Sequence, residues 1–182
     1  SHKPWHADLH EFNLGQNSSL QWKISTRPLL RWATPLLTKA DSTSTVAPGI
    51  ADKYQELIGI APFVVNNATN YRPEFTPTDT GSVIRLLHMG VGDPERSLEM
   101  PLRAVIAANQ HKPNSLTLDY YLVPGDPSYI ERLRQMAAAP GSGVTVHDPV
   151  PYDQILPTMR QYDVGTAFYP PHNINLKHSL PN

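Results

Sequence analysis

Apolar segments of strand length alternate with helical patterns through the second half of the chain. The apolar segments begin near Val83, Leu116, Val144 and Asp163. The helical patterns span roughly 94–111, 127–139 and 151–161. A strand that reaches the next strand through a helix pairs with it in parallel, because a parallel partner requires a crossover connection. The pattern predicts an α/β fold, with a Rossmann-like parallel sheet that carries helices on both faces.

The apolar positions within each helical pattern predict which side chains face the core. They are Leu98, Leu102, Val105 and Ile106 in the first, Ile130, Leu133 and Met136 in the second, and Ile155, Met159 and Tyr162 in the third. Each set recurs at the three- to four-residue spacing of one helix face.

The first half of the chain shows the same alternation in shorter pieces. Strands are expected at 5–10, 43–46 and 63–65, and helices at 20–40 and 48–58. Pro28 and Pro35 would start or kink the first of these helices, and Gly59 would cap the end of the second. Residues 67–82 are rich in Asn, Thr, Pro, Asp and Gly and have little periodicity, which predicts a linker.

The amino-acid composition excludes several classes of protein. The 182 residues carry a net charge of −1 and are 40% hydrophobic, enough for one domain or parts of two. A balanced charge argues against nucleic-acid binding, which needs a basic face. The absence of cysteine excludes a disulfide scaffold, a thiolate zinc site and a Cys nucleophile, and it fits the reducing cytoplasm. No run of about 18 apolar residues predicts a membrane span.

The stretch from Gly90 to Arg96 is the first candidate site, because it follows a predicted strand and opens a predicted helix. Open parallel sheets bind ligands at the carboxyl ends of their strands. A glycine turn there lets a phosphate approach backbone N–H groups at a helix N-terminus, and Arg96 in the first helical turn could clamp a pyrophosphate. A plain strand–helix turn with a surface arginine explains the same residues equally well.

Two later loops also directly follow a predicted strand. Asp126, followed by Pro127, has the chemistry of a helix N-cap, although a cap can also face a ligand. The proline-rich loop from Asp148 to Tyr152 could edge a flat base with its backbone groups. Asp148 and Tyr152 could equally be ordinary turn residues.

The segment from Asp8 to Phe12 contains the adjacent pair His10 and Glu11 but lacks the second histidine of a zincin helix. The other histidines are scattered, so we expect no metal site. His10 could act as a base or stabilise charge, because histidine titrates near neutrality. A hydrogen-bonded interface histidine is the alternative.

Ten motifs, in their order and spacing, resemble the large retaining family of GT-B glycosyltransferases often called group 1 or family 4. They are Asp8–Glu11, Ala40–Asp41, Gly49–Asp52, Val64–Asn67, Leu86–Gly90, Asp93–Arg96, Leu122–Asp126, Val150–Tyr152, Tyr162–Gly165 and Asn175–Asn182. The resemblance covers nearly the whole chain.

Enzymes of that family have two Rossmann-like domains with the active site in the cleft between them. The resemblance implies that residues 1–66 are the last part of the acceptor domain, residues 67–82 the interdomain linker, and residues 83–182 the nucleotide-sugar donor domain. The family continues past the segment that ends at Asn182 with a helix that holds the donor ribose. We therefore expect a fragment that is truncated at both ends.

The resemblance also assigns residues to the donor diphosphate. Gly90 matches the glycine turn at the phosphates, and Arg96 matches a basic residue on the pyrophosphate. Val91 stands where many members carry a second basic residue, and Ser97 where many carry glycine.

Other parts of the site follow in the same way. His10 matches the acceptor-domain histidine near the transferred sugar and is the expected catalytic residue. The expected base-binding residues are Asp148, Val150 and Tyr152, and the start of the donor-gripping segment is Leu180, Pro181 and Asn182.

The resemblance implies a metal-independent enzyme without a cofactor. It would move a sugar from a nucleotide-sugar to a glycan or lipid-linked acceptor, in the cytoplasm, and the whole enzyme could associate peripherally with a membrane. A non-catalytic nucleotide- or sugar-binding module on the same fold is the alternative, because fold does not fix function. A flavodoxin-like signalling domain is a third option, but the acidic pocket expected at its first strand end is missing.

Overall fold

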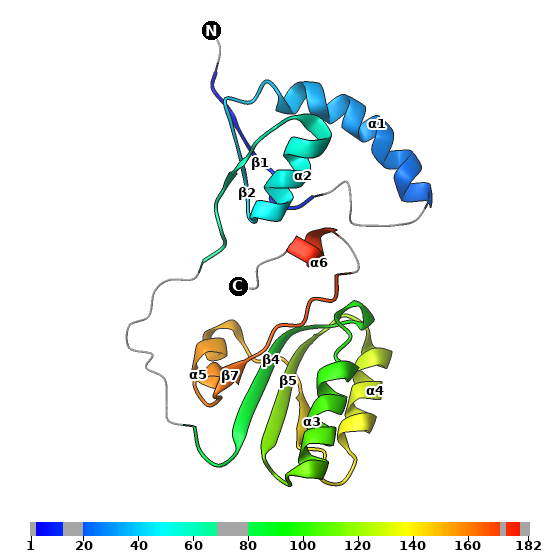
Figure 1. Cartoon of the computed structure of the whole chain (residues 1–182), viewed down its shortest axis with the longest axis vertical. Helices are drawn as coiled ribbons and strands as arrows, with labels where there is room; N and C mark the ends of the chain where they lie inside the picture. The colour runs from blue at the N-terminus through cyan, green and yellow to red at the C-terminus, as the bar shows by residue number, and fades with distance from the viewer. Residues whose placement is uncertain (1–2, 13–19, 69–79, 172–173, 179–182) are drawn as a thin grey trace. The chain divides into compact units, whose positions relative to one another are not determined.

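The computed structural model describes residues 3–12, 20–68, 80–171 and 174–178. The chain divides into two units (Figure 1), of which unit 1 comprises Ser1–Asn70 and Tyr169–Asn182 and unit 2 comprises Tyr71–Phe168. The C-terminal segment, which the sequence resemblance placed with the second domain, thus groups with unit 1.

Unit 1 contains a three-stranded parallel sheet in the order β1-β2-β3. The strands are β1 (His6–Asp8), β2 (Ser42–Thr45) and β3 (Phe63–Val64), and they alternate with the helices α1 (Leu20–Leu37) and α2 (Pro48–Ile58). The predicted alternation of strands and helices is confirmed, although β1 is shorter than the expected 5–10.

Local sequence explains where α2 begins and ends, whereas α1 runs through its prolines. Pro48 occupies the first turn of α2, where a missing N–H costs nothing, and Gly59 ends the helix at a φ of 71°. Helix α1 continues through Pro28 and Pro35, so these residues lie inside it rather than starting it. The buried side chains of unit 1 that form its core are Leu9, Phe12, Ala47, Ile50 and Tyr54.

The short helix α6 (Ile174–His178) packs on unit 1. The Asn175 side chain accepts a hydrogen bond from Phe12 N (2.7 Å) and donates one to Phe12 O (3.3 Å). A Cβ atom on Gly49, in the first turn of α2, would overlap the ring of His178. The absence of a side chain at Gly49 therefore lets α6 approach α2 closely.

Unit 2 contains a four-stranded parallel sheet in the order β6-β5-β4-β7. The strands are β4 (Ile84–Gly92), β5 (Leu116–Pro124), β6 (Val144–His147) and β7 (Val164–Gly165). Counted along the unit, this is the order 3-2-1-4 found at the centre of a Rossmann fold. The parallel sheet predicted from the sequence is confirmed.

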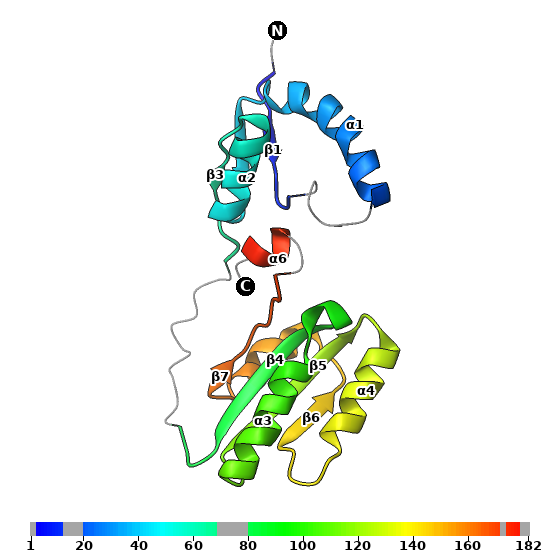
Figure 2. The ribbon, with the colours of Figure 1, turned by 45° about the vertical axis from the view of Figure 1, so that its right-hand side comes forward.

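Helices α3 (Glu99–His111) and α4 (Pro127–Ala137) cover one face of this sheet (Figures 1 and 2). The fully buried core between them and the sheet includes Leu98, Leu102, Leu118, Tyr120, Leu122, Tyr129 and Leu133. The predicted apolar faces of both helices are confirmed, since Ile106 and Met136 also pack against this core.

The predicted helix 151–161 is shorter than expected. A 3₁₀ turn, η2 (Tyr152–Gln154), leads into α5 (Ile155–Met159). The side chain of Met159, which the pattern placed toward the core, is 42% exposed.

No helix among the described ranges is long and apolar enough to span a bilayer.

Candidate functional site

The strand order of the unit 2 sheet reverses between β4 and β7, and β7 ends opposite Leu87, within β4. Strand β4 pairs with β5 on one side and with β7 on the other. Thr166, directly after β7, donates two hydrogen bonds to the carbonyl of Leu87, from its backbone N (2.7 Å) and its Oγ1 (2.8 Å). Open α/β sheets bind ligands outside the carboxyl ends of their strands at such a reversal. The residues that follow β4 and β7 are therefore the candidate site.

Gly90 lies inside β4 and not in a turn after it. The pairing of β4 with β5 continues from Gly90 opposite Leu122 to Gly92 opposite Pro124, so the turn begins at Asp93. The sequence prediction ended the strand too early, because a glycine reads as a turn unless the partner strand is known. The assignment of Gly90 to a diphosphate stays a prediction.

Two neighbouring glycines are required by packing. A Cβ atom on Gly92 would lie 2.6 Å from Cγ1 of Ile130 in α4, and one on Gly125 would lie 2.7 Å from Cγ1 of Val91. Real Cβ atoms do not approach other carbon atoms so closely. These glycines let the ends of β4 and β5 meet each other and α4.

The predicted helix 94–111 is divided in two. Asp93 caps the 3₁₀ turn η1 (Pro94–Arg96), because its Oδ1 accepts a hydrogen bond from Glu95 N at 2.8 Å. Ser97 then adopts a left-handed conformation (φ 50°), and α3 begins at Glu99. Arg96 therefore precedes α3. The sequence had predicted it in the first turn of that helix, and this prediction is wrong.

Arg96 is half-buried, with its Nη1 atom inside the protein. Burial is the main cause of the lowered pKa of His88 in β4, and the charge of Arg96 lowers this pKa further. A guanidinium here places positive charge beside the carboxyl end of β4.

His88 is a residue of this edge that sequence reasoning missed. Its side chain is buried (5% exposed) between Tyr120 and Phe168, with ring centroids 5.7 Å and 5.8 Å away. Its Nδ1 lies 3.0 Å from the carbonyl oxygen of Thr166, which can only accept a hydrogen bond. The Nδ1 atom therefore carries the proton, and Nε2 is the acceptor.

The acceptor atom of His88 points to Gly90. A Cβ atom on Gly90 would lie 3.3 Å from His88 Nε2, so any side chain at position 90 would crowd the ring. Burial lowers the pKa of His88 and outweighs the Thr166 hydrogen bond, which acts in the opposite direction. A neutral imidazole thus lies beside Gly90 and Arg96. The available signal in the sequence was a histidine within an otherwise mostly apolar strand.

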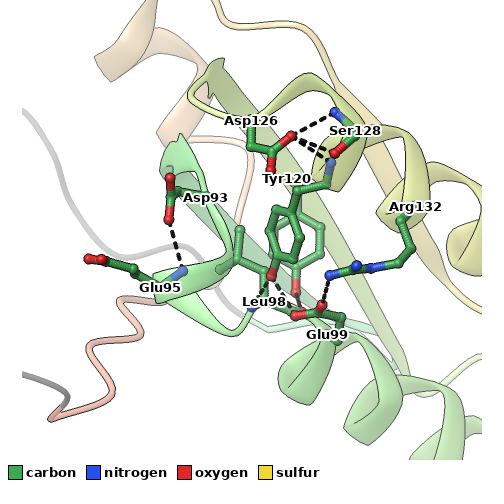
Figure 3. A network of polar contacts seen from close by, with 9 residues as sticks. Asp93, Glu95, Leu98, Glu99, Tyr120, Asp126, Ser128 and Arg132 are labelled. Carbon is green, nitrogen blue, oxygen red and sulfur yellow. Dashed lines mark hydrogen bonds and ion pairs between the residues drawn. The ribbon is translucent and has the colours of Figure 1, made fainter.

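A polar network joins the beginnings of α3 and α4 (Figure 3). Tyr129 Oη donates to Glu99 Oε2 (2.5 Å) and accepts from Leu98 N (2.7 Å), and Arg132 Nη2 donates to Glu99 Oε1 (2.6 Å). Burial acts to raise the pKa of Glu99, but the hydrogen bonds from Tyr129 and Arg132 outweigh it and lower that pKa. The network fixes both helix beginnings at the carboxyl edge of the sheet.

Asp126 acts as the N-cap of α4. Its Oδ1 accepts hydrogen bonds from Ser128 N (2.9 Å), Ser128 Oγ (2.7 Å) and Tyr129 N (3.2 Å). These bonds, first of all that from Ser128, lower the pKa of Asp126. The predicted cap is confirmed.

The proposed base-binding loop follows β6, at the opposite edge of the sheet from β7. The Asp148 carboxylate pairs with Arg134 (2.8 Å) on the surface, and the Tyr152 side chain is 91% exposed. Val150 is half-buried. The role of these three residues at a base stays a prediction.

His10 lies in unit 1, two residues after β1 ends at Asp8, and is exposed. Its catalytic role stays a prediction. Leu180, Pro181 and Asn182 lie outside the described residues.

A second polar cluster lies on the face of the sheet opposite α3 and α4. Asp119 Oδ1 accepts a hydrogen bond from His147 Nε2 (2.7 Å), and the His147 ring stacks on Tyr121 with centroids 4.5 Å apart. The hydroxyls of Tyr121 and Tyr162 are 3.2 Å apart, and burial, followed by that hydrogen bond, raises the pKa of Tyr162. The cluster ties β5 and β6 to the turn before β7. The described ranges contain no group of three or more His, Asp or Glu side chains suited to a metal ion.

Solved structures share this architecture. One is a crystal structure of the pneumococcal O-GlcNAc transferase GtfA in complex with UDP and GlcNAc, 19% identical in sequence with a TM-score of 0.51; the match covers 75% of this chain and 27% of GtfA. Another, of the GtfA/B complex, is 17% identical with a TM-score of 0.50, covering 70% of this chain and 26% of the other. The fold is that of GT-B glycosyltransferases.

The GT-B likeness agrees with the Rossmann-like fold predicted from the sequence. The chain spans about a quarter of the length of these two GT-B proteins. No protein-family model and no curated protein sequence matches the chain.

Proposed function

We propose that this chain is part of a glycosyltransferase that uses a nucleotide-sugar donor, and that unit 2 binds the nucleoside diphosphate of that donor. The support is the GT-B fold, together with the presence of UDP and GlcNAc in the structure of GtfA. In finer detail we propose a retaining enzyme of the group 1 type with a glycan or lipid-linked acceptor.

The observation that carries the proposal is the position of Arg96, which follows β4, the strand at which the strand order of the sheet reverses. A leaving diphosphate gains negative charge as the sugar departs, and a fixed guanidinium stabilises that charge. Arg96 lies at the end of η1, and its charge already acts on the buried His88 in β4. A diphosphate beside Gly90 would meet this charge and the backbone N–H groups that follow β4.

Such a site can work without a metal ion, because the guanidinium supplies the positive charge. A retaining transferase of this type also needs no pair of carboxylates of the kind that glycosidases use. Positioning and charge stabilisation are then the main contributions of the protein.

The remaining assignments belong to the same proposal. His10 would stabilise charge on the transferred sugar, and the base would lie against the loop with Asp148, Val150 and Tyr152. The donor-gripping segment would begin at Leu180, Pro181 and Asn182. Replacement of His10 by alanine in the whole protein should then slow turnover at least about tenfold, or about 1.4 kcal/mol of barrier.

A non-catalytic module is the second candidate, and Val91 favours it. Its side chain is 42% exposed at the end of β4, where many enzymes of the resembling family carry a second basic residue. A module would bind the diphosphate, but the whole protein would transfer no sugar.

Isothermal titration calorimetry with the 182-residue chain tests the binding step. Uridine, guanosine and adenosine diphosphates are titrated into the protein, and each affinity is compared with that of the matching nucleoside. We expect at least one diphosphate to bind about tenfold or more tightly than its nucleoside, because each hydrogen bond to a charged group contributes about 1.5–3 kcal/mol. Equal affinity of every nucleoside and its diphosphate, or no binding, would contradict the proposal. Sugar transfer by the whole protein then separates the enzyme from the module.

A further inference from the structure

Two buried tyrosines converge on one peptide group close to Arg96 (Figure 3). Tyr129 Oη accepts a hydrogen bond from Leu98 N (2.7 Å), and Tyr120 Oη donates one to Leu98 O (2.8 Å). Tyr120 lies in β5 and Tyr129 in α4, so two separate elements hold Leu98 by its donor and its acceptor. We call this pair of hydrogen bonds the Leu98 clamp.

Each hydrogen bond of the clamp has a fixed direction. A backbone N–H can only donate, so the Tyr129 oxygen accepts from Leu98, and its own proton goes to Glu99 Oε2 (2.5 Å). Burial raises the pKa of Tyr120 and of Tyr129, so both hydroxyls keep their protons at neutral pH. Phenylalanine at position 129 would leave the buried N–H of Leu98 without this acceptor.

The clamp lies directly after a strained residue. Ser97 has a left-handed backbone (φ 50°), which is unfavourable for a residue with a Cβ atom. Such conformations persist where the surrounding structure holds them, and they cluster at functional sites. On the other side of Ser97, Asp93 caps η1 with its side chain, and its carbonyl accepts a hydrogen bond from Arg96 N (3.0 Å). Arg96 therefore lies between two fixed points, Asp93 before it and Leu98 after it.

The chain before α3 has two courses open to it. The sequence pattern over 94–111 is that of one continuous helix, and a right-handed Ser97 would join η1 to α3 in that way. A change of handedness at one residue turns the whole preceding segment, and with it the side chain of Arg96. In the structure η1 and α3 are separate at Ser97, a course that we call the broken form. In this form the charge of Arg96 reaches His88, whose pKa is lowered by burial and then by this charge.

We propose that Tyr129 is a positioning residue for Arg96. Through its hydrogen bond to Leu98 it holds η1 in the broken form, with the guanidinium of Arg96 where the donor diphosphate binds. The inference rests on the proposed function for its ligand, whereas the hold on η1 can be measured without a ligand. A nucleoside has no phosphate for Arg96 to bind, so loss of the Tyr129 hydroxyl should weaken binding of the diphosphate alone.

Calorimetry with the 182-residue chain tests the effect on the ligand. Tyr129→Phe keeps the ring and removes the hydroxyl. We expect it to weaken nucleoside diphosphate binding about fivefold, the result if about one chain in five keeps the broken form. If Tyr129 acts through Arg96, its hydroxyl should not matter once the guanidinium is gone. The double variant should therefore bind the diphosphate as tightly as Arg96→Gln alone, and a further loss in the double variant would overturn the proposal.

Amide hydrogen exchange of the ligand-free chain tests the hold on η1 itself. The amides of Arg96 and Ser97 close this turn, and we expect them to exchange at least about tenfold faster in Tyr129→Phe. Val105→Ala is the matched control, because it truncates a buried side chain of α3 and keeps both tyrosine hydroxyls. It should lower the global stability but change neither the exchange of η1 nor the diphosphate affinity. Circular dichroism checks that every variant is folded.

The outcomes separate this inference from the proposed function. If no nucleoside diphosphate binds to the unaltered chain, the proposed function fails, and the exchange rates alone decide whether Tyr129 holds η1. Unchanged exchange in Tyr129→Phe, or an equal effect of Val105→Ala, would overturn the inference and leave Tyr129 as an ordinary core residue. If Tyr129→Phe does not fold, Tyr120→Phe releases the other side of the same peptide group and is tested with the same expectations.

Discussion

The Nδ1 atom of His88 lies 3.0 Å from the carbonyl oxygen of Thr166, and this hydrogen bond joins β4 to the segment after β7. It crosses the sheet at the strand-order reversal where we place the diphosphate. The same residue therefore supports the fold and shapes the proposed site.

Replacement of His88 by phenylalanine should lower the stability of unit 2 by about 1–3 kcal/mol, because the carbonyl of the half-buried Thr166 loses its donor while an aromatic ring still fills the space. Stability should also depend on pH through this residue. Its pKa is lowered in the folded state, so below the ordinary value of 6.5 the unfolded chain takes up a proton that the folded chain does not. The free energy of unfolding should fall as pH drops from 7 through that value.

Urea denaturation at several pH values checks both parts. His88→Phe should show a shallower pH dependence than the unaltered chain. A His88→Phe variant with full stability and an unchanged slope would exclude the hydrogen bond described here.

Ser97 occupies a left-handed conformation (φ 50°) that glycine adopts without cost. We expect Ser97→Gly to be neutral or to raise stability by up to about 1 kcal/mol. Gly59 also has a positive φ (71°), and an added Cβ there would meet nothing within 4 Å. Gly59→Ala should therefore lower the free energy of unfolding by about 1–2 kcal/mol through backbone strain alone.

Thermal unfolding of these variants can be compared with Gly81→Ala, a site without positive φ and with nothing within 4 Å of an added Cβ. That control should change stability little. If the Ser97→Gly variant is clearly less stable than the parent chain, the serine side chain contributes more stability than its left-handed backbone conformation costs.

Gly92→Ala should destabilise unit 2 by about 1–3 kcal/mol, because the new Cβ would lie 2.6 Å from Cγ1 of Ile130. The double variant with Ile130→Ala should lose less than the sum of the two single changes, by about 1 kcal/mol or more. Chemical denaturation of the four proteins gives this coupling energy. Strict additivity would show that Gly92 and Ile130 do not compete for the same space.

Arg96→Gln should weaken nucleoside diphosphate binding by about 1.5–3 kcal/mol, the range for a hydrogen bond to a charged group. Affinity for the matching nucleoside should stay the same, and Arg103→Gln on the exposed side of α3 should affect neither ligand. Calorimetry measures all of these affinities. A diphosphate affinity that Arg96→Gln leaves intact removes Arg96 from the site.

Much of the fold could be predicted because local signals agreed with it. Pro48 and Gly59 mark both ends of α2, and Asp126 followed by Pro127 marks the start of α4. The alternation of strands and helices required parallel pairing, and the structure has it.

The details of the candidate site depend on partners that are distant in sequence. The end of β4 is set by pairing with β5, which carries the strand two residues past Gly90. The break before α3 comes from the left-handed Ser97, and serine gives no such signal. His88 reads as an ordinary core histidine until β7 brings Thr166 beside it.

The most direct test of the central claim is a titration of the isotope-labelled chain with uridine or guanosine diphosphate, followed by amide ¹H–¹⁵N spectra. The account predicts that the largest shifts fall on the amides from Gly90 to Ser97 and on Thr166, and that the nucleoside alone leaves these signals in place. Saturable diphosphate binding with no shift in these residues would contradict it.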